Sequence, residues 1–246
     1  AIKNIRELIP LNRDPSVSWI NVSGVHEIGA IEQIGKLFDI HPLILEDIVN
    51  TAQRPKIEDF DQYVYIVMKM LYHDKEDDEV KAEQVSFILG SHFLISFQEQ
   101  DGDVFDAVRE RIRKGKGRIR KAGCDYLAYA LMDALVDNYF VVLETLGEQM
   151  ELLEQDLIDK PTPEILESIH YMKREMIFLR RLIWPLREVV SVLARGEIAL
   201  IRQSTIVFLR DVDDRLGADR ALEVTMDFRL GEVVVTRVKV FHESLS

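Results

Sequence analysis

The chain has 246 residues, 47% of them hydrophobic, which is enough to fill the core of one large domain or two modest ones. It carries 43 acidic and 31 basic residues, a formal net charge of −12, which disfavours nucleic acid as a partner and tolerates cations. A single cysteine, Cys124, excludes an internal disulfide and favours a reducing compartment such as the cytosol. No uninterrupted apolar run is long enough to cross a membrane, so the sequence predicts a soluble chain.

Residues 1–121 alternate patterns that are typical of strands and of helices. Residues 17–23 alternate apolar and polar side chains, as a half-buried strand does. The segments 62–73, 82–89 and 92–99 are also strand-like, and only short connections separate them. We therefore expect an antiparallel meander rather than a purely parallel sheet.

Helical patterns are interleaved with these strands. Apolar residues recur at helical spacing between positions 28 and 38, and Pro42 begins a second segment because proline is tolerated at a first helical position. A third helical pattern follows Asp103, which we predict as its N-cap. These elements predict a mixed domain of the α+β class over residues 1–121.

From residue 122 the pattern changes to apolar residues at alternating steps of three and four. A first series predicts one helix to about Asp159, Pro161 and Pro163 break it, and a second series predicts another helix, which Pro185 should kink. Two such series joined by a short turn imply a long antiparallel hairpin over residues 122–203. The series are Tyr129, Met132, Val136, Tyr139, Leu143, Leu146, Met150, Leu153 and Leu157, then Ile165, Ile169, Met172, Met176, Leu179, Ile183, Leu186, Val190 and Leu193.

The hairpin has more apolar surface than two helices need for each other. We expect a third helix or a second subunit to cover it. On this pattern alone, a soluble coiled-coil module that serves dimerisation or scaffolding remains open.

Motifs of common enzymes are absent from the sequence. It contains no phosphate-binding glycine loop and no HExxH, GxSxG or CxxC pattern, and its six histidines are not spaced as zinc ligands. We therefore predict that the chain is not an enzyme.

Two adjacent acids, Glu46 and Asp47, stand in the stretch "HPLILEDIVN". Neighbours on a helix point about 100° apart, so the pair cannot easily hold one ion together. Taken alone, the pair is most simply explained as solvated surface acids.

An ordered set of segments between about residues 19 and 212 resembles the CorA family of magnesium channels. The longest is "FDIHPLILEDIVNTAQRPKIEDFDQYVYIVMKML", and the likeness continues through "EQVSFIL", "FQEQDGDVFDAVRERIR", "DYLAYALMDALVDNYF", "IWPLREV" and "FLRDV". The resemblance implies a cytosolic α/β/α sandwich with a mixed sheet, followed by long helices, in a homopentamer. It also implies a stalk helix, here residues 204–246, that leads into two transmembrane segments outside this chain.

The same resemblance implies regulatory magnesium sites between subunits. Asp47 of "LED" would face Asp211 of "FLRDV" on the adjacent subunit, and a second ion would be lined by Glu46, Asp133 and again Asp211. Mg²⁺ suits such sites because it prefers oxygen ligands and is often held by one or two carboxylates. Co²⁺ or another divalent cation is an alternative occupant. The expected chain is thus the soluble sensor domain of a channel at the cytoplasmic face of the membrane.

After Val212 the sequence departs from the family. Where the family usually continues Tyr-Asp-His, this chain has Asp213 and Arg215 in place of the tyrosine and the histidine. Gly217 and Gly231 each weaken a helix by ~1 kcal/mol relative to alanine, and "EVVVTRVKV" has strand character. We expect Arg215, close to Asp211, to lower metal affinity there.

A zinc transporter of the ZntB type is the nearest alternative in the same superfamily. Carboxylates without cysteine or clustered histidine favour a hard cation over zinc.

Overall fold

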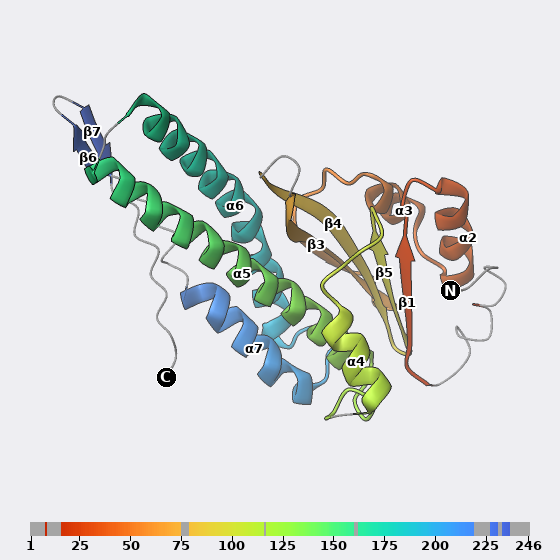
Figure 1. The fold of residues 1–246 in the computed structure, drawn as a ribbon. Coiled ribbons are helices and arrows are strands. Elements are labelled where there is room, and N and C mark those ends of the chain that lie inside the picture. Colours follow the sequence, from red (N-terminus) through yellow and green to blue (C-terminus); the bar gives the residue numbers. More distant parts are fainter. Residues whose placement is uncertain are drawn as a thin grey trace.

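The structure is a computed structural model that describes residues 8, 16–74, 79–115, 117–159, 162–218, 227–230 and 233–236 (Figure 1). Pro161 and Gly231, which the sequence singles out as helix-breaking positions, lie outside the described residues.

A five-stranded sheet forms the centre of the N-terminal part. Strand β1 pairs in parallel with β5, and the pairs β5–β4, β4–β3 and β3–β2 are antiparallel. This arrangement confirms the mixed, largely antiparallel sheet and its meander. The strands, in spatial order, are β1 (Ser18–Ser23), β5 (Phe93–Gln98), β4 (Glu79–Gly90), β3 (Tyr63–Asp74) and β2 (Lys56–Asp59).

Both faces of the sheet are buried, by different helices. Tyr65 and Val67 of β3 belong to a core with α2 (Ile28–Phe38) and α3 (Pro42–Val49). Their neighbours Val64 and Ile66 belong to a second core with the helices that follow β5. Successive side chains of a strand point to opposite faces, so an uninterrupted apolar strand fits a sheet covered on both sides. The predicted α/β/α sandwich is confirmed.

Helix α3 carries the two adjacent acids and is held in place by an N-terminal cap and by contacts with the sheet. Pro42 occupies its first turn, and the side chain of His41 accepts a hydrogen bond from the Leu43 amide at 3.3 Å, as a cap. The amide of His41 in turn donates to the Tyr63 hydroxyl at 3.0 Å. Ile44 and Ile48 are buried against the sheet, which leaves the other side of the helix toward solvent.

The prediction that Asp103 caps the next helix was wrong. Helix α4 (Asp106–Lys114) begins later, with Phe105 at the N-cap and no side-chain cap. Asp103 instead accepts a hydrogen bond from the Phe105 amide at 2.9 Å and pairs with Arg109. Phe105 is buried, and Arg109 forms a bidentate pair with Asp103; these two contacts outweigh the local preference for a cap at Asp103.

Two long helices and a shorter one complete the structure. Helix α5 (Cys124–Asp159) and helix α6 (Pro163–Arg195) run side by side beyond the sandwich, and α7 (Gln203–Ala218) lies against both (Figure 1). In the two apolar series, all residues are buried except Leu153 and Ile165, which are partly buried. The helical hairpin and its covering third helix are confirmed.

The helix boundaries follow from local chemistry. Thr162 caps α6, its hydroxyl accepting from the Ile165 amide at 3.5 Å, and Pro163 stands in the first turn. Gly196 ends α6 in the left-handed conformation that glycine adopts without strain. Pro185 lies inside α6, which continues to Arg195, and its kink remains a prediction.

Helix α5 is long and apolar enough, by composition, to span a membrane, but 67% of its most apolar window is buried inside the structure. Its apolar side chains pack in one core with those of the sheet and of α6, which accounts for that character. Two polar side chains also bond to β3: the Tyr139 hydroxyl donates to the Lys69 carbonyl, and the Asn138 side-chain amide donates to the Leu71 carbonyl at 2.5 Å. Among the described residues it alone passes this composition test.

Beyond α7, two short strands form an antiparallel pair, β6 (Asp227–Leu230) and β7 (Val233–Thr236). The strand character of the tail is thus confirmed over Val233–Thr236.

Candidate metal-binding sites

The four predicted metal ligands lie in two regions of the chain. Glu46 and Asp47 are on α3, on one face of the sheet, whereas Asp133 on α5 and Asp211 on α7 are on the other side (Figure 1). The structure therefore brings Asp133 and Asp211 into one region and keeps them apart from the α3 acids.

Asp47 is held by two neighbours from the segment after α3. The Gln53 amide donates to its Oδ1 at 2.9 Å, and the Lys56 ammonium lies 2.5 Å from its Oδ2. Burial alone would lower the pKa of Lys56, but its hydrogen bonds to Asp47 and Glu58 outweigh burial and raise it. Because the Asp47 side chain keeps 27% of its surface exposed, an outside cation can still reach it.

Glu46 is exposed, and the described part of the chain offers its carboxylate no ion-pair partner. The two adjacent acids therefore differ: Asp47 is paired with Lys56, and Glu46 is solvated. A separation of about 100° around the helix lets the two side chains face different surroundings.

The backbone beneath Asp47 is fixed by buried polar side chains of the sheet. The Gln84 amide donates to the Asp47 carbonyl at 3.1 Å, and the Lys69 ammonium donates to the Thr51 carbonyl at 2.7 Å. Burial lowers the pKa of Lys69. These bonds join α3 to β3 and β4, so the position of Asp47 is set by the sheet rather than by a mobile loop.

Arg215 stands at the centre of the second region. Its Nη1 lies 2.6 Å from Asp137, its Nη2 pairs with Asp133, and its Nε lies 3.6 Å from Asp211. A planar guanidinium matches carboxylates well because its N–H donors form a rigid fork. A single side-chain cation, Arg215, thus lies close to three carboxylates.

The cluster keeps a net negative charge, because one guanidinium faces three carboxylates. Burial raises the pKa of Asp133, Arg215 opposes that shift, and the nearby Asp137 adds to it. The Tyr129 hydroxyl donates a further hydrogen bond to Asp133 at 3.3 Å. Asp211, in contrast, is 71% exposed, so most of its carboxylate faces solvent.

Asp137 was not among the predicted ligands. A signal existed in the sequence, because "DALVD" places it four residues after Asp133 and therefore on the same helix face. Its partner Arg215 was identified only as a neighbour of Asp211.

A buried carboxylate fixes the start of α7 relative to α5. Asp125, 3% exposed, accepts bonds from the Arg202 guanidinium at 2.5 Å and from the Thr205 hydroxyl at 2.6 Å. Burial alone would raise the pKa of Asp125, but these bonds outweigh it and lower the pKa. The Asp125 anchor, as we call Asp125 with Arg202 and Thr205, sets where Asp211 projects along α7.

Within one chain, the predicted ligands do not form a metal centre. The residues that the structure describes include no group of three His, Cys, Asp or Glu side chains arranged to hold a metal ion. Both regions nevertheless present oxygen donors, the ligands that hard divalent cations prefer.

The family model described as "CorA-like Mg2+ transporter protein" matches residues 14–231 of this chain. The chain belongs to the CorA family. It is 46% identical, over 211 residues, to the cobalt/magnesium transport protein CorA of Thermotoga maritima. That match covers 86% of this chain and 60% of the relative, so the chain spans well under the full length of this CorA protein.

Solved structures show the same fold. The soluble domain of CorA from Methanocaldococcus jannaschii matches with a TM-score of 0.67 at 16% identity and covers 83% of each chain. The ZntB cytoplasmic domain from Vibrio parahaemolyticus matches with a TM-score of 0.64 at 15% identity, covering 81% of this chain and 79% of that one. At these identities the likeness concerns the fold, which CorA and ZntB share.

Proposed function

We propose that this chain is the cytosolic sensor domain of a CorA-type magnesium channel and binds divalent cations between subunits. One observation carries the proposal: Asp47 and Asp211 are both accessible, yet they lie on different sides of one chain. They can share an ion only if they come from two copies. The match to a cobalt/magnesium transport protein supports Mg²⁺ as the ion, with Co²⁺ as a second candidate.

Magnesium suits this arrangement chemically. It keeps several of its waters and is commonly held by one or two carboxylates, so a pair of facing aspartates is enough. In this account Asp47 of one subunit and Asp211 of the next hold a hydrated ion. Lys56 must then yield part of its contact with Asp47, which a flexible lysine can do.

Gating follows from the charges. When Mg²⁺ is plentiful, the ion neutralises two facing carboxylates and joins neighbouring subunits, which keeps the pore closed. When Mg²⁺ falls, the two carboxylates repel each other, the subunits separate at this boundary, and the stalk helices move. The domain thus senses the ion that its channel transports.

The same proposal includes a second ion between Glu46, Asp133 and Asp211, but in this chain we expect the affinity of that second site to be lower. Arg215 already occupies the space beside Asp133 and Asp211 with its own positive charge. A divalent cation there would face that guanidinium, so we expect Asp47 with Asp211 to be the dominant site.

Exposed apolar side chains support self-assembly. Trp184 on α6 is 68% exposed, and Val207 on α7 lies one turn before Asp211 and is also exposed. Large exposed apolar residues often mark interaction surfaces. We propose a homopentamer that is attached to the cytoplasmic face of the membrane through segments beyond this chain.

The experiment is a thermal melt with and without Mg²⁺. We expect Mg²⁺ to raise the melting temperature of the wild-type chain and the shift to be lost in Asp47→Asn. The matched control is Asp39→Asn, which removes the same charge from the exposed end of α2 on the same face. An unchanged Mg²⁺ shift in Asp47→Asn contradicts this site.

The ZntB alternative is distinguished by the same melts with Zn²⁺ in place of Mg²⁺. The candidate ligands are carboxylates without histidine or cysteine, which favours the harder ion. A shift that depends on Asp47 for Zn²⁺ but not for Mg²⁺ favours a ZntB-type sensor.

A further inference from the structure

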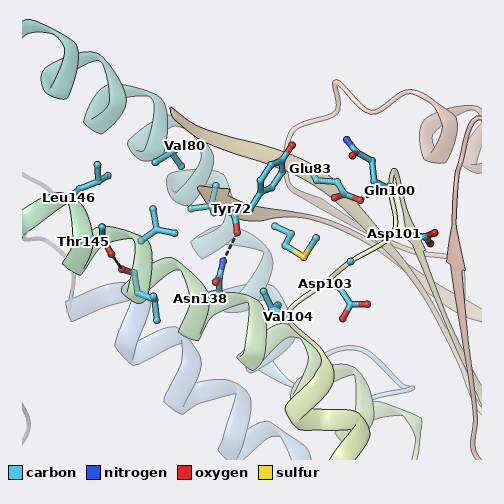
Figure 2. A pocket seen from close by; sticks show the side chains of 15 residues that line it. Tyr72, Val80, Glu83, Gln100, Asp101, Asp103, Val104, Asn138, Thr145 and Leu146 are labelled. Atoms are coloured by element: carbon cyan, nitrogen blue, oxygen red, sulfur yellow. Dashed lines mark hydrogen bonds between the residues drawn. The ribbon is translucent and has the colours of Figure 1, made fainter. Parts of the chain in front are cut away.

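A cavity of about 460 Å³ lies between the sheet and α5, on the face opposite α3 (Figure 2). Its volume falls within the range of small-molecule sites. Its walls come from β3, β4, the loop before α4 and the middle of α5. Much of the wall is apolar, formed by Met70, Leu71, Val80, Val104, Val142 and Leu146.

The polar end of the cavity is acidic. Glu83, Asp101 and Asp103 contribute to it, and none of the described residues that line the cavity is basic. Figure 2 shows these carboxylates toward one end and Val80 and Leu146 toward the other. A cavity with one acidic and one apolar end is complementary to a cation that carries an apolar chain.

Two of the three carboxylates are already satisfied. Asp101 is exposed and therefore solvated. Asp103 is paired with the Arg109 guanidinium at 2.5 Å, and the bonds from Arg109 and the Phe105 amide outweigh burial and lower its pKa. Neither group needs a further cation.

Glu83 is different. It is 5% exposed, and its Oε1 accepts the amides of Glu99 at 2.6 Å and Gln100 at 3.0 Å. Within the described part of the chain its Oε2 accepts no hydrogen bond and pairs with no cation, and it is not among the fully buried atoms that lack a partner. Burial raises the pKa of Glu83, and the charges of Glu99 and Asp103 add to that shift. A buried carboxylate without a cation is costly, so a ligand that supplies one gains free energy.

We propose that the cavity binds a primary alkylammonium ion, whose head pairs with Glu83 and whose chain lies along the apolar walls. An ammonium group brings three donors, which can reach Glu83 Oε2 and the Gln100 side chain. A hydrated divalent metal fits less well because much of the cavity wall is apolar and Asp103 is already paired with Arg109. The ligand would link the sheet to α5 beside Asn138.

The test compares n-hexylamine with n-hexanol by calorimetric titration of the chain in the absence of divalent cations. The two probes share the alkyl chain and differ in the charged head. We expect the amine to bind about ten-fold or more tightly than the alcohol, the factor that one charged hydrogen bond supplies. Equal affinity for the two probes overturns the proposal.

Two variants locate the site. Glu83→Gln should remove the preference for the amine, while Glu79→Gln, an exposed change on the same strand, should keep it. Val141→Trp, at an exposed position on the cavity wall, should weaken both probes by obstructing the cavity without touching Glu83. Retained amine preference in Glu83→Gln, or unchanged amine binding in Val141→Trp, contradicts the proposal. Mg²⁺ plays no part in these titrations, so their outcome is separate from that of the metal sites.

Discussion

The acids on α3 and the acids on α5 and α7 use the same kind of charge in opposite ways. On α3, Asp47 is braced by a lysine and an amide, and Glu46 is left to solvent. On α5 and α7, Arg215 holds Asp133 and Asp137 and reaches Asp211. The lysine is a flexible point charge that can move aside, whereas the arginine is a rigid fork that fills its site.

This contrast indicates where an external cation can compete. A divalent ion can displace Lys56 from Asp47 because the lysine is a flexible point charge and its pair with Asp47 is only partly buried. It cannot displace Arg215 as readily, since the rigid guanidinium pairs with Asp133 and Asp137 at once and reaches Asp211. We therefore expect metal dependence to reside in Asp47 and in the exposed Asp211.

The largest expected effect comes from separating α7 from α5 at the Asp125 anchor. Asp125→Ala leaves Arg202 and Thr205 without their acceptor and should lower the free energy of unfolding by about 3 kcal/mol. Chemical denaturation measures this. Glu46→Ala, an exposed change on the other face of the sheet, serves as the control and should cost far less.

Acid should also remove the contribution of Asp125 to the free energy of unfolding. The pKa of Asp125 is lower in the folded chain than its unfolded value, so its stabilisation is present above the unfolded pKa of ~3.9 and is lost as pH falls through the folded pKa. The difference in stability between wild type and Asp125→Asn should therefore be full at neutral pH and shrink below about pH 4. A difference that stays constant down to the acid transition contradicts the ion pair.

Replacing Arg215 should convert the second region into one that responds to metal. Arg215→Gln leaves Asp133 and Asp137 without a counter-ion, and we expect a loss of about 2 kcal/mol without divalent cations. Mg²⁺ should restore part of that loss, as seen in denaturation curves. Arg210→Gln, an exposed change on the same helix, is the matched control; equal behaviour of the two variants contradicts the role of Arg215.

Replacing Lys56 should have the smallest effect on stability and a clear one on metal binding. Lys56→Gln removes two partly exposed ion pairs, with Asp47 and Glu58, and we expect the free energy of unfolding to fall by about 1 kcal/mol. Because Asp47 then lacks its internal cation, the Mg²⁺-induced rise in melting temperature should grow. A smaller rise than in wild type contradicts the view that Lys56 and Mg²⁺ compete.

Much of the fold could be predicted from the sequence because its periodic patterns are long. The two apolar series ran over many turns, and nearly every residue in them is buried. The strands of the meander were predicted from β-branched and aromatic runs, although β4 begins earlier than expected, at Glu79. The prediction of a cap at Asp103 was wrong because that carboxylate pairs with Arg109, a contact that local capping rules do not include.

The site was less accessible to sequence reasoning because its contacts join distant segments. Asp125 and Arg202 stand 77 residues apart, and Asp133 and Arg215 stand 82 apart. No local pattern predicts such pairs. The candidate ligands themselves came from the family resemblance, since adjacent acids such as Glu46 and Asp47 are ordinary surface residues by pattern alone.

Mixing two variants tests whether Asp47 and Asp211 of different copies share one ion. Asp47→Asn and Asp211→Asn should each fail to show Mg²⁺-dependent association in sedimentation. When the two are mixed, some subunit boundaries pair an intact Asp47 with an intact Asp211, so we expect Mg²⁺-dependent association to return in part. A mixture that responds no better than either variant alone would contradict a site shared between subunits.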